Sequence, residues 1–458
     1  MKWGIYNLLF AIIYPFLLPG FLVRMLRRGG YAARMGDRFA LYPKDLFGKH
    51  RPLFDSHSPS TKHQAPSTNF IWIHAVSVGE VQVAGQLMRE WRAVDPSVRF
   101  CFSTTSSTGW KMAEREVERR GEEGGDVLIY NPLDFPNFVK SALKTIRPRA
   151  IILTESEIWP NFILRAKKMD IPIFLINARV SDRSAPRYKA ARWFFGDVLS
   201  AFTRIFAQSD LDKARLVAAG APADKVEVTG SFKFDVAKRN EAKEAELRAW
   251  ICAAETAPSR ILLGGSTWPG EDEVLLRIYQ KILTSDLRST PTSTPLLVIA
   301  PRHFEKADAV EANIRKAGFA CVRRSRTKHQ APGTKHPASA VFLADTTGEL
   351  MGLYGIADVV FVGKSLCAHG SQNMIEPCLC GKPTLVGPYT ENFRPVMSDL
   401  LAADAIVQVK DEAELEEKVQ ECWEGFGGLK GLGARAQAAV ERRRGVVAKC
   451  VTSIRSAL

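Results

Sequence analysis

The stretch Ile71-Trp72-Ile73-His74-Ala75-Val76-Ser77-Val78-Gly79-Glu80 begins as a short apolar run, breaks into a turn of small residues and ends on a carboxylate. After it, apolar residues recur at helical spacing, so the pattern predicts a strand, a turn and a helix. Such a turn opens at the carboxyl edge of a parallel sheet, where open α/β folds bind their ligands. Glu80 is therefore a candidate general base, although the helix dipole also favours an acidic residue in a first helical turn.

On both sides of this stretch, short apolar runs alternate with helical patterns over most of the 458 residues. This alternation predicts an α/β protein with two doubly wound domains in tandem, which should face one another across an interdomain cleft. The first set of predicted strands is Ile71–Ala75, Arg99–Ser103, Val127–Tyr130, Ala150–Leu153, Ile171–Ile176, Ile205–Ala207 and Val226–Thr229. The second set is Ile261–Gly264, Leu296–Ala300, Val341–Leu343, Val359–Val362 and Thr384–Val386.

An uncharged apolar run extends from Gly4 to Val23, with Lys2 before it and several arginines after it. Its length suits a bilayer core, and no clear signal-peptidase site follows, so residues 1–28 are predicted to form a retained membrane anchor. The arginines place the rest of the chain on the cytoplasmic side of the inner membrane. Pro15 and Pro19 weaken a straight spanning helix, which leaves open a segment that lies in the membrane interface.

The composition indicates a globular protein with an anionic partner. The formal net charge is +14, which fits a phospholipid surface, a phosphorylated substrate or a nucleic acid, and charge alone does not choose among them. Eight cysteines form no C-x-x-C pair, and eight histidines form no paired metal-ligand spacing. Reduced thiols and no metal site are therefore expected.

The hexapeptide Thr61–Pro66 recurs word for word as Thr327–Pro332. Neither copy has the periodicity of a core element, so residues 54–69 and 324–339 are predicted to be solvated insertions outside the fold. The resulting domains are residues 29–240 and residues 241–458.

Charged residues follow two further strands of the first domain. Glu155 and Glu157 come after a buried strand, where one carboxylate could orient a substrate hydroxyl or a basic neighbour and the other could cap the next helix. Lys233 lies between two phenylalanines and could neutralise a phosphate or carboxylate. Ordinary helix-start acids and a linker lysine explain the same residues equally well.

The second domain carries turns that suit an anion. The run Gly264–Thr267 leads from a strand through glycines to hydroxyl side chains, so Ser266 and Thr267 are candidate phosphate or sugar contacts, as is Ser365 further along. Arg302 ends the next predicted strand, where a guanidinium can bind phosphate through two hydrogen bonds.

Taken together, eight ordered features closely resemble the Kdo transferases of lipopolysaccharide synthesis, which move 3-deoxy-D-manno-oct-2-ulosonic acid (Kdo) from CMP-Kdo to a lipid A precursor. They are the N-terminal apolar run and the motifs H-A-V-S-V-G-E (74–80), E-S-E-I-W-P-N (155–161), N-A-R-V-S-D-R-S (177–184), T-G-S-F-K-F-D (229–235), A-P-R-H (300–303), T-G-E-L-M-G-L-Y-G-I-A-D (347–358) and N-M-I-E-P (373–377). The resemblance implies a GT-B architecture with two Rossmann-like domains, of which the first binds the acceptor and the second binds CMP-Kdo. It also implies an inverting transfer to lipid IVA without metal or cofactor, at the inner membrane and without a nucleic-acid partner.

Carried over by motif, Glu80 would be the general base, and Glu155 and Lys233 would stabilise the transition state. The residues that match the CMP-binding segments are Pro301, Arg302, Gly348, Glu349, Leu350, Asn373, Met374, Ile375 and Glu376.

Two segments depart from the family pattern. Where the family commonly has G-G-S-L and G-G-H-N, this chain has Gly363–Leu366 with a lysine at position 364, and His369–Asn373. The backbone could therefore approach the donor differently there. Two other functions stay open: another membrane-associated GT-B glycosyltransferase or epimerase that uses a different nucleotide sugar, and a basic membrane-bound scaffold without turnover.

Overall fold

The computed structural model describes residues 2–28, 32–43, 46–47, 70–118, 125–251, 260–286, 295–327, 337, 339–424 and 429–458. The chain divides into two compact units, of which unit 1 is Met1–Val236 with Gly445–Leu458 and unit 2 is Ala237–Arg444. Each unit is an α/β structure around a parallel seven-stranded sheet, so the prediction of two such domains is confirmed.

The sheet of unit 1 has the strand order β3-β2-β1-β4-β5-β6-β7. Its strands are β1 Phe70–His74, β2 Arg99–Thr104, β3 Val127–Tyr130, β4 Ala150–Thr154, β5 Ile173–Ala178, β6 Arg204–Ala207 and β7 Val226–Val228. Each pairs in parallel with its neighbours, and β1 is buried along its whole length. Because the interior strands are covered on both faces, they are continuous apolar runs rather than alternating ones.

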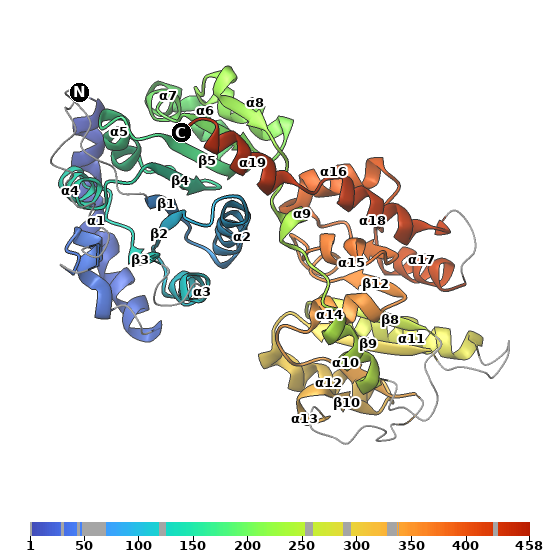
Figure 1. Cartoon of the computed structure of the whole chain (residues 1–458). Helices are drawn as coiled ribbons and strands as arrows, with labels where there is room; N and C mark the ends of the chain where they lie inside the picture. Colours follow the sequence, from blue (N-terminus) through green and yellow to red (C-terminus); the bar gives the residue numbers. More distant parts are fainter. Residues whose placement is uncertain are drawn as a thin grey trace. The chain divides into compact units, whose positions relative to one another are not determined.

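Helices cover both faces of this sheet (Figure 1). They are α1 Lys2–Arg28, η1 Ala32–Phe39, α2 Val78–Val94, α3 Ser107–Glu118, α4 Pro136–Ile146, α5 Pro160–Lys168, α6 Ala185–Ala190, α7 Arg192–Ser200, α8 Asp210–Ala218, η3 Ala223–Lys225, α9 Lys233–Val236 and α19 Val446–Arg455. Alternate residues of β1 enter two separate cores: Phe70 and Trp72 pack on one face, and Ile71 and Ile73 on the other.

The last helix, α19, belongs to unit 1 and not to the second domain to which its position in the sequence assigned it. Its apolar side chains, among them Val447 and Val451, share a core with Ile71 and Ile73. The Asp235 carboxylate accepts hydrogen bonds from the backbone N–H groups of Gly445 and Val447, both at 2.7 Å. The predicted boundary at residue 240 therefore lies close to the point after Val236 where the chain passes from unit 1 to unit 2. The sequence pattern did not show that the chain returns to unit 1 at Gly445.

Helix α1 packs alongside α4 and α5 of unit 1 (Figure 1). The Tyr6 hydroxyl donates to Asp134 at 2.9 Å, and the Asn161 amide donates to Asn7 at 2.8 Å. The opposite face is apolar and exposed at Ile5, Leu8, Leu9, Ile12, Ile13 and Phe16. Within the described ranges, no helix combines the length and apolar character needed to cross a bilayer, so the predicted spanning anchor is not supported.

The sheet of unit 2 has the strand order β10-β11-β9-β8-β12-β13-β14 and is also parallel. Its strands are β8 Ile261–Thr267, β9 Leu296–Pro301, β10 Cys321–Arg323, β11 Val341–Leu343, β12 Val359–Val362, β13 Thr384–Val386 and β14 Val407–Gln408. Every residue of β8, the middle strand, is buried.

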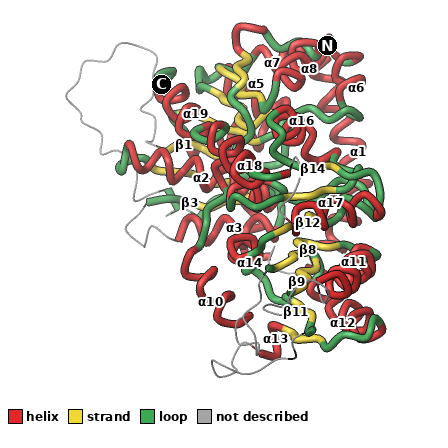
Figure 2. Tube along the Cα trace, turned by 90° about the vertical axis from the view of Figure 1, so that its right-hand side faces the viewer, coloured by secondary structure: helices red, strands yellow, loops and turns green. Residues whose placement is uncertain are grey.

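Figure 2 shows α11, α12 and α17 along one face of this sheet and α14 on the other. The helices of unit 2 are α10 Glu241–Ile251, α11 Glu271–Asp286, η4 Phe304–Lys306, α12 Ala307–Lys316, α13 Arg324–Thr327, α14 Leu350–Ile356, α15 Ile375–Leu379, η5 Glu391–Phe393, α16 Arg394–Ala402, α17 Glu412–Glu424 and α18 Leu432–Arg442. Side chains of α11, α12 and α17 form one continuous core with β8, β9 and β12.

The predicted insertion at 54–69 and residues 328–336 and 338 of the second insertion lie outside the described residues. Residues 324–327, which the sequence pattern assigned to the second insertion, instead form α13, and Arg324 is buried. The sequence did not show this because the residues that hold Arg324 lie more than twenty positions away along the chain.

Candidate active site

Glu80 lies in the first turn of α2, where it exchanges hydrogen bonds with Ser77, the N-cap residue of the helix. The Ser77 hydroxyl accepts from the backbone N–H of Glu80 at 3.2 Å and donates to one carboxylate oxygen of Glu80 at 2.8 Å. The other carboxylate oxygen accepts from the backbone N–H of Val76 at 3.0 Å and from the Thr154 hydroxyl at 3.1 Å. Three donors therefore fix the carboxylate, and Glu80 is 9% exposed. Glu80 is both a helix-capping acid and a carboxylate at the carboxyl edge of the sheet.

The strand order brings the second predicted carboxylate to the same edge. Because β4 pairs with β1 in a register that places Leu153 opposite His74, Thr154 and Glu155 follow directly beside the turn that carries Glu80. Glu155 has φ +50°, in the left-handed region that is costly for a residue with a side chain. Its carboxylate contacts Arg179 Nε at 2.9 Å and accepts from the Asn177 amide at 3.3 Å.

Lys233, the third predicted residue, lies at the start of α9 between Phe232 and Phe234, which are both buried in the core. The Asn177 side chain joins this segment to Glu155, because its oxygen accepts from the backbone N–H of Phe232 at 3.1 Å. Burial lowers the pKa of Lys233, and the charge of Glu155 opposes that shift.

Glu155 is the predicted residue that interacts electrostatically with both of the others, Glu80 and Lys233. Burial raises the pKa of Glu155, the positive charges of Arg179 and Lys233 lower it, and the negative charge of Glu80 raises it further. Two carboxylates and two cations at one edge can move a proton and balance the charge that develops during a transfer. The sequence motifs contained Asn177 and Arg179 but gave them no role, and Thr154 directly precedes the motif that begins at Glu155.

Glu157 does not cap the following helix, although the sequence left that possibility open. The backbone N–H groups of Asn161 and Phe162 in α5 donate instead to Asp134, at 3.0 and 2.8 Å. The carboxylate of Glu157 accepts from the Trp159 indole at 2.8 Å and lies 3.5 Å from Nε2 of the buried His74. Burial would raise the pKa of Glu157, but these contacts outweigh burial and hold the pKa below its ordinary value.

In unit 2, the predicted nucleotide-binding residues Pro301, Arg302 and Gly348–Leu350 line a pocket of about 590 Å³ that is open to solvent. The ends of β8, β9 and β11 supply its walls, which include Ser266, Pro301, Arg302, Thr346, Thr347, Gly348, Glu349 and Leu350. Gly348 has φ +81° with no atom within 4 Å of an added Cβ, so the backbone conformation, not crowding, requires glycine there.

The segment Asn373–Glu376 reaches the same region through Arg302. The Asn373 amide donates to Glu376 at 3.0 Å, and its oxygen accepts from the backbone N–H of Ile375 at 3.1 Å. Burial raises the pKa of Glu376, while the Asn373 hydrogen bond and the Arg302 charge lower it. Met374 and Ile375 are fully buried, so this segment can contact a ligand through its polar side chains and its backbone.

The three remaining candidates lie close to one another in the fold. Ser266 borders the pocket that Arg302 and Gly348 line, and Thr267 borders a second pocket with Trp268 and His303. The hydroxyl of Ser365 is used inside the fold, because it donates to the Val362 carbonyl at 2.5 Å and accepts from the backbone N–H of Gly387 at 2.8 Å. A donor contact by Ser365 stays a prediction.

A buried carboxylate organises the loop that departs from the family pattern. Glu271 accepts from the backbone N–H groups of Trp268, Lys364, Ser365, Leu366 and Cys367, at 2.8 to 3.4 Å. Lys364 has φ +57°, and its ammonium group lies 5.1 Å from the centre of the Trp268 ring. The sequence pattern had not singled out Glu271.

Comparisons with known proteins identify relatives along nearly the whole chain. Residues 33–236 match the family model described as 3-deoxy-D-manno-octulosonic-acid transferase (kdotransferase). A Bordetella pertussis protein named 3-deoxy-D-manno-octulosonic acid transferase is 32% identical over 411 residues, which cover 89% of this chain and 88% of the relative. A Haemophilus influenzae protein of the same name is 30% identical over 91% of this chain and 89% of its own.

A solved structure of Anabaena HepE in complex with UDP has a TM-score of 0.55 to this chain. It is 14% identical, and the alignment covers 85% of this chain and 100% of the Anabaena chain. At this identity the similarity shows a shared fold and nothing about the ligand.

Proposed function

Since this chain belongs to the 3-deoxy-D-manno-octulosonic acid transferase family and is a Kdo glycosyltransferase of lipopolysaccharide synthesis, we propose that it moves Kdo from CMP-Kdo to a lipid A precursor such as lipid IVA. The transfer inverts the anomeric configuration and needs no metal. The observation that carries the proposal is the fixed carboxylate of Glu80 beside Glu155, Lys233 and Arg179.

In this reaction Glu80 accepts the proton of a sugar hydroxyl on the acceptor. The hydroxyl oxygen then bonds to the anomeric carbon of Kdo, and the bond from that carbon to the phosphate oxygen of CMP breaks with both electrons going to CMP. A carboxylate held by Val76, Ser77 and Thr154 cannot rotate away from the acceptor, so part of its effect comes from orientation. Lys233 and Arg179 supply positive charge where negative charge develops.

The pocket of unit 2 fits the nucleotide part of the donor. Arg302 can bind a phosphate through two hydrogen bonds, and the Thr347 and Ser266 hydroxyls offer partners for a ribose or a phosphate. When the bond to the anomeric carbon breaks, CMP leaves with negative charge. The reaction therefore requires a site that holds a nucleoside monophosphate and compensates this charge.

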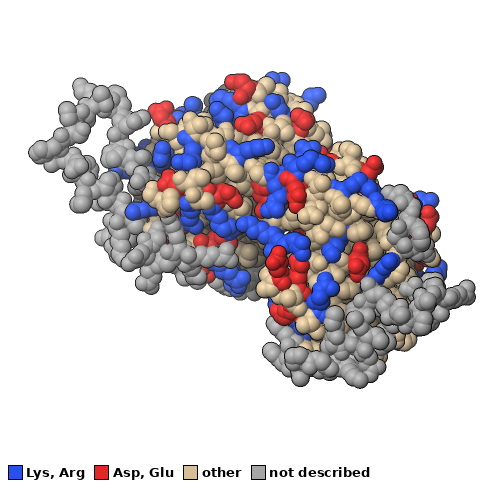
Figure 3. Space-filling model, turned by 45° about the vertical axis from the view of Figure 1, so that its right-hand side comes forward, with Lys and Arg blue, Asp and Glu red and all other residues tan. Residues whose placement is uncertain are grey.

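The acceptor is a phosphorylated lipid, and we place the protein at the cytoplasmic side of the inner membrane. The exposed apolar face of α1, where Phe16 is 81% exposed, would lie in the membrane interface while the other face packs on unit 1. Lys and Arg side chains prevail over Asp and Glu on the face shown in Figure 3, in keeping with the net charge of +14 and an anionic surface. A triple variant with serine at Leu8, Ile12 and Phe16 should stop sedimenting with anionic vesicles but still use acceptor dispersed in detergent.

The test of the reaction combines the purified full chain, CMP-Kdo and lipid IVA. Release of CMP should depend on the acceptor, and the product mass should show how many Kdo units are added. EDTA should leave the rate unchanged, and NMR of the product should show the opposite anomeric configuration to the donor. Turnover of a UDP-sugar in preference to CMP-Kdo would overturn the proposal, as would binding of CMP-Kdo without acceptor-dependent release of CMP.

A further inference from the structure

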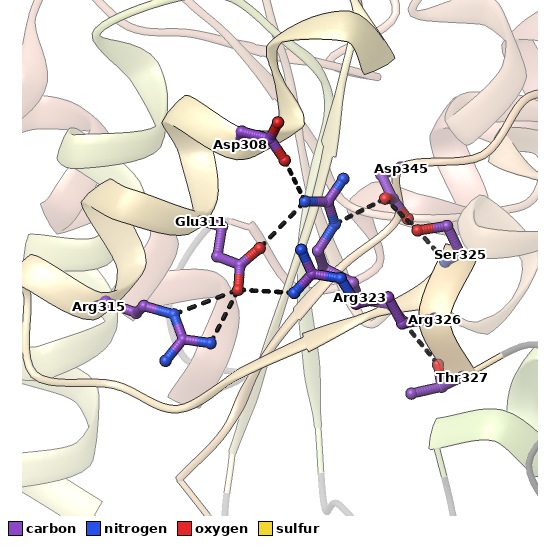
Figure 4. Close-up of polar contacts among 8 residues, drawn as sticks. All are labelled: Asp308, Glu311, Arg315, Arg323, Ser325, Arg326, Thr327 and Asp345. Carbon is purple, nitrogen blue, oxygen red and sulfur yellow. Dashed lines mark hydrogen bonds and ion pairs between the residues drawn. The ribbon is translucent and has the colours of Figure 1, made fainter.

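The turn Ala344–Leu350, which forms one wall of the nucleotide pocket, is held from the side opposite the ligand. Its first acid, Asp345, accepts from the backbone N–H of Ser325 at 2.8 Å, from the Ser325 hydroxyl at 2.5 Å and from Arg323 Nε at 2.8 Å (Figure 4). These three donors occupy both oxygens of a carboxylate that is almost completely buried.

The second acid of the turn, Glu349, is held by the neighbouring arginine. Arg324 donates to its carboxylate from Nε at 3.1 Å and from a terminal nitrogen at 3.0 Å, and the Thr346 hydroxyl donates to it as well. Burial would raise the pKa of Glu349, but the hydrogen bonds from Arg324 and Thr346 outweigh burial and hold the pKa below its ordinary value. Glu349 therefore borders the pocket with a carboxylate that is already bound.

Arg324 is itself fixed in place. Its side chain is 4% exposed, its guanidinium carbon lies 5.1 Å from the centre of the Trp250 ring, and it forms an ion pair with Glu246. The Trp250 indole donates to the Thr327 hydroxyl at 2.9 Å, which attaches α13 to α10. A planar guanidinium that is buried, stacked and paired on two sides has little freedom to move.

Arg323 continues the same support on the outer side. It bonds Asp345, Glu311 at 3.1 Å and Asp308, and Figure 4 shows it pointing into this group of carboxylates. Arg315 and Arg326 also bond Glu311, but both are more than 60% exposed and neither contacts the turn in Figure 4. The cluster thus has an inner arginine pair that reaches the turn and an outer pair that does not.

We propose that Arg323 and Arg324 are positioning residues for the donor, which fix the turn so that Thr346, Thr347 and Gly348 meet the nucleotide. Arg324 acts through Glu349, and Glu349 does not bind the nucleotide itself. A polar turn with a left-handed glycine has little apolar surface to hold its shape, so buried charge pairs on the far side do so instead. This inference rests on the proposed function in one respect, the identity of the nucleotide as CMP.

The test is a double-mutant cycle with Arg324→Gln, Glu349→Gln and the double variant, read by the Kd for CMP from calorimetry. Each single change should weaken CMP binding and raise the KM for CMP-Kdo about tenfold, with kcat within about threefold and the acceptor KM unchanged. The double variant should be no worse than either single one, because both changes remove the same contact. Arg324→Lys, which keeps the charge without the paired geometry, should recover part of the affinity.

Arg326→Gln is the matched control, since Arg326 lies on the same helix and is an exposed arginine that bonds Glu311. Its Kd for CMP should equal that of the wild type, and thermal melting of every variant should show that the fold persists. Additive losses in the cycle would mean that Glu349 contacts the nucleotide directly, and unchanged binding by Arg324→Gln would refute the positioning role. If the wild type bound UMP in place of CMP, the donor assignment would fail, while the same cycle run with UMP would still decide the role of Arg324.

Discussion

Glu80 of unit 1 and Glu271 of unit 2 occupy similar places in their units. Each lies in the first turn of a helix, α2 or α11, that follows an interior strand of a parallel sheet. Each carboxylate also accepts a backbone N–H from the turn before its own helix, from Val76 or from Trp268.

The two carboxylates differ in what the neighbouring strand of the sheet supplies, which is β4 for Glu80 and β12 for Glu271. The loop after β12 folds over Glu271 and supplies four further backbone N–H donors, so that Glu271 is 0% exposed. The end of β4 gives Glu80 one hydroxyl, from Thr154, and leaves it 9% exposed beside a second carboxylate and two cations. One local arrangement thus yields a structural carboxylate in one unit and a candidate base in the other, and the adjacent strand decides which.

The largest effect should come from Glu80→Gln. The glutamine side chain keeps the size of the glutamate but cannot take a proton, so the rate of Kdo transfer should fall about 10² to 10⁴-fold while the melting temperature changes little. An acceptor-dependent CMP-release assay and a thermal melt measure the two effects. Near-normal transfer by this variant would remove Glu80 from the chemistry.

Glu271→Gln should show the opposite pattern. An amide NH₂ group placed among five backbone N–H donors leaves buried donors without acceptors, so the free energy of unfolding of unit 2 should fall by about 2 kcal/mol or more. Urea unfolding of the full chain measures this, with the exposed Glu305→Gln as the control. A stability equal to that of the wild type would contradict the structural role.

Thr154→Val tests the single contact that distinguishes the surroundings of Glu80. Valine keeps the shape of threonine but removes the hydroxyl that Glu80 and the His74 carbonyl share. We expect kcat to fall about tenfold and the KM for CMP-Kdo to stay the same, because one of three contacts that orient the carboxylate is lost. A change confined to KM would mean that Thr154 acts on binding.

The smallest effect concerns the pH dependence of stability at Glu155. Because burial raises the pKa of Glu155, the folded protein keeps this proton at pH values where the unfolded chain, with a pKa of about 4.3, has lost it. This contribution is complete below the unfolded pKa and is lost as the pH rises through the folded pKa. Wild-type stability should therefore decrease relative to Glu155→Gln as the pH rises from about 4.3 towards neutrality in urea titrations. The opposite slope would indicate that Arg179 and Lys233 dominate over burial.

The sequence predicted the sheets well wherever a strand is a buried apolar run. The predicted Ile71–Ala75 and Thr384–Val386 correspond to β1 and β13 within one residue. The edge strands β10 and β14, of three and two residues, were not among the predictions, and neither is long enough to show a period. The equally short edge strand β7 was predicted, as Val226–Thr229.

The sequence predicts the site only where a local motif indicates the role of a residue. Glu80, Glu155 and Lys233 come from motifs, and the structure brings Glu155 within electrostatic range of the other two. Glu349 also comes from a motif, as a CMP-binding residue, yet its carboxylate is bound by Arg324 from elsewhere in the chain. Glu271 is bound by distant partners in the same way and was not singled out. Such partners depend on strand order, which local patterns do not contain.

The return of α19 to unit 1 has a consequence for synthesis on the ribosome. Residues 237–444 are translated before α19, so the first 236 residues emerge with one side of their core uncovered and stay so through the whole translation of unit 2. During that interval Asp235 lacks the two amides that it later binds. Unit 1 can therefore complete its core only after unit 2 has been translated. During this time the incomplete unit 1 is exposed to chaperones and proteases.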